Sequence, residues 1–205
     1  MTESGKESGK TFTWTDYQNW PDDEQWEIIG GEAFVMTPSP LERHQYVCGE
    51  LFAALRTFFK SKKCAVYFAP MDVRFSETDV VQPDLLVVCD PKQRRMTHIE
   101  GPPRLIVEVL SPSSAVYDRG KKLTLYARSG VHEVWLATPY PSSIEVFVLD
   151  GDSYRLKATH GREDKLVSQT FPELAIVLDP IFDFPVDPDE RIHVGKEVSP
   201  RYSTR

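Results

Sequence analysis

Apolar residues in this chain fall into short runs of the length of buried strands, and one run contains a charged side chain. Residues 105–110 read Leu-Ile-Val-Glu-Val-Leu, a continuous stretch typical of a strand covered on both faces. Because side chains alternate along a strand, Glu108 is expected on the same face as Ile106 and Leu110. An unpaired carboxylate there would cost several kcal/mol. The pattern therefore predicts a cationic partner for Glu108.

A helix is expected soon after this strand. Residues 111–114 contain a proline break, and in the segment that follows Asp118, Lys122 and Tyr126 recur every four residues. Residues at this spacing share one face of a helix. The pattern therefore predicts a helix that directs a lysine back at the buried carboxylate of the strand.

A second apolar run repeats the combination of a carboxylate with a buried strand. Residues 85–89 are wholly apolar, and Asp84 stands at their entrance directly after Pro83, which suits the start of a strand. Before this run, a helix is predicted over residues 41–60, with His44 in its first turn. A lone histidine is more often structural than catalytic, so His44 is only an accessory candidate.

The other predicted elements follow from turn residues and apolar alternation. Glu27 and Glu32 flank a Gly-Gly turn and are expected on a solvated face. The elements are a short helix that Thr13 or Thr15 caps and Pro21 ends, a hairpin around Gly30-Gly31, a strand over residues 64–75 bent at Pro70, a strand over 132–139, a hairpin over 144–156 and a closing segment over 171–182.

Length and composition indicate one soluble domain. The 205 residues, 40% hydrophobic and 27% charged, suit a domain over 13–184 between a disordered tail, 1–12, and a charged tail, 185–205. No apolar run could span a bilayer or serve as a signal peptide, so we expect no membrane partner and a cytoplasmic location. The three cysteines form no C-x-x-C pair and are expected to be buried, reduced thiols.

The charge distribution neither requires nor excludes nucleic-acid binding. The net charge of −7 argues against binding through overall charge, because affinity for phosphate backbones comes mainly from Lys and Arg contacts. Acidic residues that hold metal ions would contribute to that −7 until the ions bind. The connection over residues 90–103 is basic, and it is either a local positive patch or a solvated loop.

Two strand carboxylates and a lysine suit the metal-dependent hydrolysis of a phosphodiester. Carboxylate oxygens bind Mg²⁺ or Mn²⁺ and leave positions for water and substrate. The ion lowers the pKa of bound water, and a nearby ammonium orients that water or stabilises the transition state. Each residue also has a plainer reading: Asp118 and Lys122 as an i, i+4 ion pair, Glu108 as the partner of an arginine such as Arg74, and Asp84 as a turn former.

These residues resemble the PD-(D/E)XK nuclease superfamily, and the frame around them resembles the bacterial Uma-two family of restriction-endonuclease-like proteins. The matching pieces span roughly residues 13 to 182 and include WEIIGGEAFVMTPSP, His44, DVVQPDLLVV, IVEVLSPSS, YDRGKKLTLYARSGVHEVW and FPEL. One departure is that Leu110, not lysine, stands two residues after Glu108. The resemblance implies that the lysine has moved to the following helix, at Lys122 rather than Lys121.

The resemblance implies an α/β (α+β) fold, a restriction-endonuclease-like core with a central mixed β-sheet flanked by helices, to which the N-terminal hairpin and further antiparallel strands are added. It also implies a homodimer and DNA as substrate. Asp84, Glu108 and the backbone carbonyl of Val109 would hold Mg²⁺ or Mn²⁺, and Lys122 would position or activate water. His44 and Tyr126 match family positions and, with Asp118, are accessory candidates.

Two other functions remain open from the sequence. The acidic charge and the lack of a recognisable DNA-reading motif are also typical of a non-catalytic binding or assembly module that keeps the nuclease fold. A glycosidase that uses the two carboxylates as acid and base is weaker, because it gives Lys122 no role.

Overall fold

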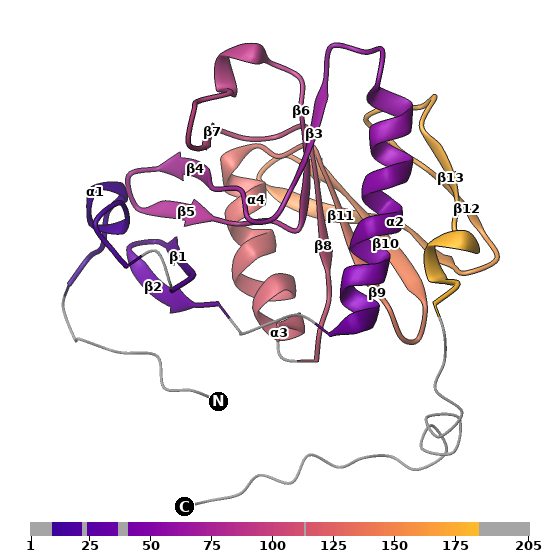
Figure 1. Ribbon diagram of the computed structural model, residues 1–205, viewed down its shortest axis with the longest axis horizontal. Helices are drawn as coiled ribbons and strands as arrows, with labels where there is room; N and C mark the ends of the chain where they lie inside the picture. The colour runs from indigo at the N-terminus through magenta and orange to yellow at the C-terminus, as the bar shows by residue number, and fades with distance from the viewer. Residues whose placement is uncertain (1–9, 22–23, 37–40, 113, 185–205) are drawn as a thin grey trace, which may run out of the picture.

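The protein is built around a six-stranded sheet in the order β11-β10-β9-β8-β6-β3 (Figure 1). The computed structural model describes residues 10–21, 24–36, 41–112 and 114–184. Strands β8 and β9 are parallel and all other neighbours are antiparallel, so the sheet is mixed, as predicted. The strands are β3 (Ala65–Phe68), β6 (Leu85–Val88), β8 (Leu105–Val109), β9 (Glu133–Thr138), β10 (Ser143–Asp150) and β11 (Ser153–Gly161).

Both faces of the inner strands are buried, which explains their continuous apolar sequences. Side chains at alternate positions, such as Val107 and Trp135, pack against helix α2 (Glu42–Phe59). The intervening side chains, Ile106 and Leu110 among them, pack against α4 (Leu123–Ser129). Glu108 shares the parity of this second set, so its side chain is directed to the α4 face.

A second, five-stranded sheet in the order β2-β1-β5-β4-β7 lies beside the first. The strand predicted over residues 64–75 is in fact two strands, since the chain leaves the central sheet after β3 and enters the second sheet at β4, turning at Pro70. The remaining strands are β1 (Trp26–Ile29), β2 (Glu32–Val35), β4 (Val73–Ser76), β5 (Asp79–Val81), β7 (Ile99–Glu100) and the separate pair β12 (Lys165–Val167) and β13 (Ala175–Val177).

Helix boundaries follow from local signals. Thr13 caps the short helix α1 (Trp14–Tyr17) in a capping box with Asp16, and Gly130 ends α4 in the left-handed region at φ 84°. The helical stretch before α4 begins with α3 (Ala115–Tyr117) and continues through a π-helical turn, η2 (Asp118–Lys122). Two 3₁₀ turns complete the set, η1 (Pro91–Gln93) and η3 (Pro180–Phe182).

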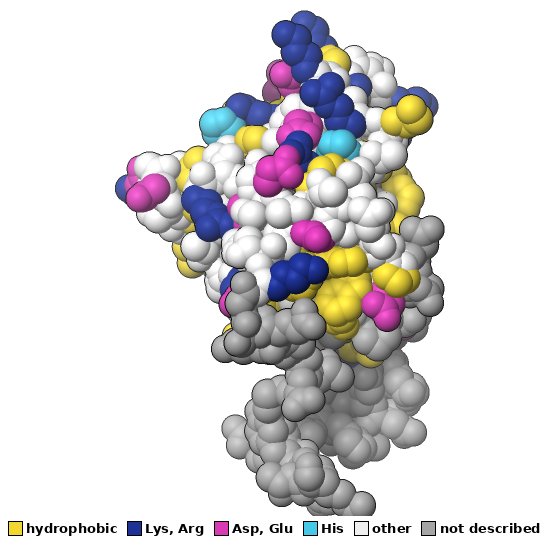
Figure 2. Space-filling view, turned by 90° about the vertical axis from the view of Figure 1, so that its left-hand side faces the viewer, with side chains coloured by type: hydrophobic (Ala, Val, Ile, Leu, Met, Phe, Trp, Pro, Cys, Tyr) yellow, Lys and Arg dark blue, Asp and Glu magenta, His cyan; other side chains and the backbone are white. Residues whose placement is uncertain are grey.

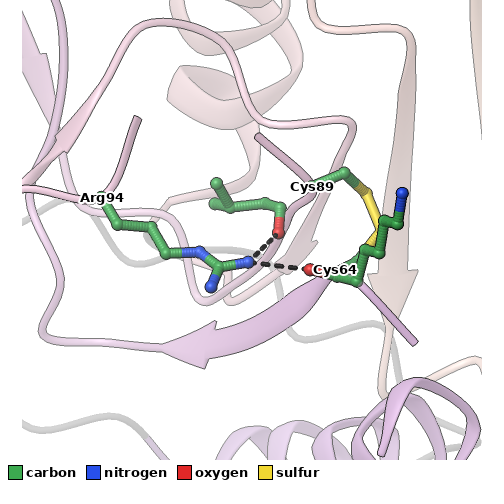
Figure 3. Close-up of a disulfide and its surroundings, with 5 residues drawn as sticks. Cys64, Cys89 and Arg94 are labelled. Atoms are coloured by element: carbon green, nitrogen blue, oxygen red, sulfur yellow. Dashed lines mark hydrogen bonds between the residues drawn. A yellow bond between two sulfur atoms is a disulfide. The ribbon is translucent and has the colours of Figure 1, made fainter. Parts of the chain in front are cut away.

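The expectation of three reduced thiols is wrong, because Cys64 and Cys89 form a disulfide (Figure 3). Ala65 and Val88 are partners in the antiparallel β3–β6 pair, so Cys64 and Cys89 form the next pair outward, with Cα atoms 3.9 Å apart. Strand pairing brings them together across 25 residues, which no C-x-x-C motif could indicate. Cys48 is the free thiol and is half-buried.

The predicted tails fall largely outside the described residues, apart from residues 10–12, where the Phe12 amide donates to the carbonyl of Gly31 at 2.9 Å. The division into one domain and two tails stays a prediction. In the part of the chain that the structure describes, no helix combines the length and the apolar character needed to cross a membrane.

Candidate active site and metal centre

Lys122 lies at the centre of a buried cluster of carboxylates. Its Nζ is 3.0 Å from Glu27 Oε1, 3.3 Å from Glu108 Oε1 and 3.6 Å from Asp118 Oδ1. All four side chains are at most 6% exposed. The predicted cationic partner of Glu108 is therefore Lys122, whereas Arg74 pairs with Glu100 and Glu77.

The electrostatics of this cluster show that negative charge is in excess. Burial raises the pKa of Glu108 well above its ordinary value, against the opposing attraction of Lys122. Burial likewise raises the pKa of Asp118. Burial would lower the pKa of Lys122, but attraction to Glu108 and Glu27 outweighs it and raises that pKa. Lys122 therefore stays protonated, and its single ammonium group faces three carboxylates.

Helix geometry explains why Lys122 and Tyr126 both reach the strand carboxylate. The π-helical turn over residues 118–122 buries Asp118 and Lys122, and π turns inside helices occur frequently at functional sites. One turn later, the Tyr126 hydroxyl donates to Glu108 Oε1. Asp118, Lys122 and Tyr126 therefore lie on one face of the helical segment, as predicted.

Asp84 and Glu108 are linked through the ends of neighbouring strands β6 and β8. The Val109 amide donates to Asp84 Oδ2 at 2.7 Å, and the Asp84 amide lies 3.4 Å from Glu108 Oε2. These reciprocal contacts hold the two carboxylates close together at one end of the paired strands β6 and β8. Asp84 is half-buried and Glu108 is almost fully buried, so Asp84 is the more accessible of the two.

His44 approaches the same place from the first turn of α2. Its Nε2 is 3.3 Å from Asp84 Oδ2. Burial would lower the pKa of His44, but the hydrogen bond to Asp84 and its charge outweigh it and raise that pKa. One helical turn on, Cys48 Sγ is 3.6 Å from His44 Nδ1. His44, Cys48 and Asp84 offer ligand atoms that all lie within 4.8 Å of one another, and no sequence pattern singles out Cys48.

A cleft of about 660 Å³ opens onto these groups. Its wall contains side chains from the central sheet and from both long helical segments, including His44, Asp84, Glu108, Asp118 and Lys122. Val109 also lines it. The cleft therefore adjoins all three predicted catalytic residues.

The chain matches the family model described as "Uma2: Putative restriction endonuclease" over residues 14–179. It belongs to the Uma2 family. The matched residues contain every group of the cluster described above, so the family match and the cleft concern the same part of the molecule.

Two known proteins are similar to this Uma2 chain, one in sequence and one in structure. An uncharacterized protein of Synechocystis sp. is 29% identical over 144 residues, which is 61% of this chain and 76% of the relative. The crystal structure of a putative nuclease of Anabaena variabilis, of the DUF820 group, superposes with a TM-score of 0.68 at 17% identity and covers 83% of this chain and 97% of that one. The second comparison shows a shared fold and confirms the predicted nuclease-like core.

Glu27 is the site residue of this Uma2 chain that sequence reasoning placed wrongly. It was expected on a solvated face, yet it is 2% exposed, touches Lys122 and accepts a 2.9 Å hydrogen bond from the Gln82 amide. Glu32, its counterpart across the turn, is exposed and pairs with Lys121, as expected of a surface residue. Glu27 stands in the apolar run Trp-Glu-Ile-Ile, and the rule that selected Glu108 would have selected it as well.

The donor set of this Uma2 site fits a divalent cation. The carboxylates of Glu27, Asp84, Glu108 and Asp118 face a single lysine and a histidine, and carboxylate oxygens are the ligands that Mg²⁺ and Mn²⁺ prefer. Asp84, Glu108 and Val109 all line the cleft, and Asp84 also belongs to the group with His44 and Cys48. Burial raises the pKa of Glu108 and of Asp118, and a bound cation would favour their charged forms.

Proposed function

We propose that this chain is a metal-dependent endonuclease that hydrolyses DNA phosphodiester bonds in the cleft. The observation that carries the proposal is the meeting of Asp84, Glu108 and Lys122 on one cleft wall, from two core strands and the following helix. Membership of the Uma2 family supports nuclease activity in general, and the choice of metal and of DNA rests on the donor set and the family resemblance.

Asp84, Glu108 and the Val109 carbonyl would hold Mg²⁺ or Mn²⁺. The chemistry that such an ion supplies is activation of water and neutralisation of charge on the phosphate. Lys122, which three carboxylates keep protonated, would orient the attacking water or donate to a phosphate oxygen as charge develops there. It would not act as a base, since its proton is held too strongly.

Tyr126, Asp118 and His44 would position the groups that react. The Tyr126 hydroxyl would orient the Glu108 carboxylate through its hydrogen bond. Asp118 would restrain the Lys122 ammonium, and His44 would restrain the Asp84 carboxylate. Such outer contacts commonly change metal affinity by about 10- to 100-fold when removed.

The test compares two neighbouring lysines. Purified protein is incubated with plasmid and with single-stranded DNA in Mg²⁺, Mn²⁺ or EDTA, as wild type, Lys122→Met and the matched control Lys121→Met. We expect metal-dependent cleavage that falls at least about 100-fold in Lys122→Met and persists in Lys121→Met, because Lys121 pairs with Glu32 on the surface. Asp84→Asn, in a half-buried residue, provides a second inactive variant that should fold.

No cleavage under any condition, or equal cleavage by both lysine variants, would contradict the proposal. Calorimetry with Mn²⁺ then separates the alternatives. Binding that disappears in Asp84→Asn supports a metal site, whereas no Mn²⁺ binding favours a non-catalytic binding or assembly module. The homodimer and the cytoplasmic location implied by the resemblance stay predictions, and light scattering tests the first.

A further inference from the structure

Positive charge in this acidic chain is concentrated at the end of β3 and β6 that lies away from the cleft. Two loops meet there, residues 60–64 between α2 and β3 and residues 89–96 after β6. Together they hold six Lys and Arg residues and one acid, Asp90, in a chain of net charge −7. Figure 2 shows Lys and Arg side chains gathered at the top of that view, the end where α2 meets β3 in Figure 1.

Four of these cations carry charge that is not neutralised locally. Lys60, Lys63, Lys92 and Arg95 are exposed, and within the described ranges none of them forms an ion pair. Lys62 pairs with Glu173. We name the set of four the basic end.

Two links hold the loops of the basic end together (Figure 3). The Cys64–Cys89 disulfide joins them covalently. The Arg94 guanidinium adds a second link, because its Nη2 donates to the carbonyls of Lys63 at 2.9 Å and Val88 at 3.3 Å. The backbone of loops held in this way loses little conformational freedom when their cations bind an anion.

Strand β3 connects the basic end with the cleft. It is an edge strand of the central sheet, it begins two residues after Lys63 of the basic end, and it ends at Phe68, which is 58% exposed and lines the cleft. The five residue steps from Lys63 to Phe68 span at most roughly 17 Å, which is the length of about 5 base pairs of duplex. Both ends of this edge are thus within reach of one short nucleic-acid segment.

We propose that the basic end is a second contact for the nucleic-acid substrate, binding backbone phosphates about five nucleotides from the bond that lies in the cleft. This inference rests on the proposed function. It explains how a chain of net charge −7 can hold a polyanion: the acidic cluster takes up the metal, and affinity comes from cations at the other end of β3. The partner is nucleic acid rather than a lipid surface, because only a linear polyanion would also reach the cleft.

The test measures binding separately from cleavage. Fluorescence anisotropy with a labelled duplex of about 20 base pairs, in EDTA, is recorded between about 50 and 200 mM salt. The variant Lys63→Gln/Lys92→Gln is compared with the control Lys157→Gln/Lys165→Gln, which removes two exposed lysines of β11 and β12.

We expect Lys63→Gln/Lys92→Gln to bind about tenfold or more weakly, with a slope of log affinity against log salt smaller by about 2, and the control to stay within about twofold of wild type. In cleavage assays the same variant should raise KM and leave kcat unchanged.

Equal loss in the variant and the control, or no loss in either, would overturn the basic end as a specific contact. Weaker binding to phosphatidylserine vesicles with unchanged DNA binding would overturn nucleic acid as its partner. Binding that weakens as expected in a protein that never cleaves DNA would support the basic end while refuting the endonuclease, so the two proposals fail separately.

Discussion

Replacing Lys122 should destabilise the metal-free protein far more than replacing its nearest partner, Glu27. At an effective dielectric constant of about 20, two charges 3.0 Å apart attract by about 5 kcal/mol before desolvation is counted. Lys122→Met removes the buried cation and leaves three carboxylates without one. Breaking a buried pair in this way costs about 3–5 kcal/mol.

Glu27→Gln should have a much smaller effect. Lys122 keeps Glu108 and Asp118 as partners, the glutamine carbonyl can still accept from Gln82, and buried negative charge decreases by one. We expect a cost of about 1 kcal/mol or less. The difference in the free energy of unfolding between Lys122→Met and Glu27→Gln therefore measures how far buried negative charge exceeds positive charge in the cluster.

The assay is urea unfolding in EDTA, followed by circular dichroism. The control is Lys121→Met, which loses an exposed pair worth at most about 1 kcal/mol. Added Mn²⁺ should restore part of the stability of Lys122→Met, because an ion that binds only the folded state stabilises it.

The pH dependence follows from the raised pKa values of Glu108 and Asp118. A carboxyl whose pKa is higher in the folded state than in the unfolded state contributes stability at low pH and loses it as the pH rises through the folded value. The free energy of unfolding in EDTA should therefore rise as the pH is lowered from about 8 to about 5, and the deficit of Lys122→Met should shrink. If Glu27→Gln is as destabilising as Lys122→Met, or if the deficit does not change with pH, the cluster is not acid-rich and the reasoning fails.

Three further predictions concern single contacts. Cys64→Ser/Cys89→Ser should lower the free energy of unfolding by about 3 kcal/mol, from the entropy of the 25-residue loop, and wild type in reductant should match it. Tyr126→Phe, which removes the donor to Glu108, should weaken Mn²⁺ binding by calorimetry by about tenfold; unchanged affinity would mean that the tyrosine only packs. Thr13→Ala should cost about 1 kcal/mol in urea unfolding through the lost cap of α1, with Thr15→Ala as a control that should be neutral.

Local pattern accounts for much of what was predicted correctly. The continuous apolar runs predicted β6 and β8 because strands buried on both faces need no polar side chains, and the spacing of Asp118, Lys122 and Tyr126 predicted a shared helix face. A carboxylate in the middle of such a run also predicted its own cation, because burying a charge alone is too costly.

The errors share one cause, which is that the deciding contact is distant in sequence. Cys64 and Cys89 meet only because β3 and β6 pair, and Glu27 is buried only because the second sheet lies against the helix that carries Lys122. The sequence by itself thus determined which strands are buried, which helix follows and which acid needs a cation, since these depend on neighbouring residues. Only the tertiary structure decided that Glu27 joins the cluster, that His44 approaches Asp84 and that two loops form a linked basic end, since strand pairing and sheet packing bring together residues that the sequence keeps apart.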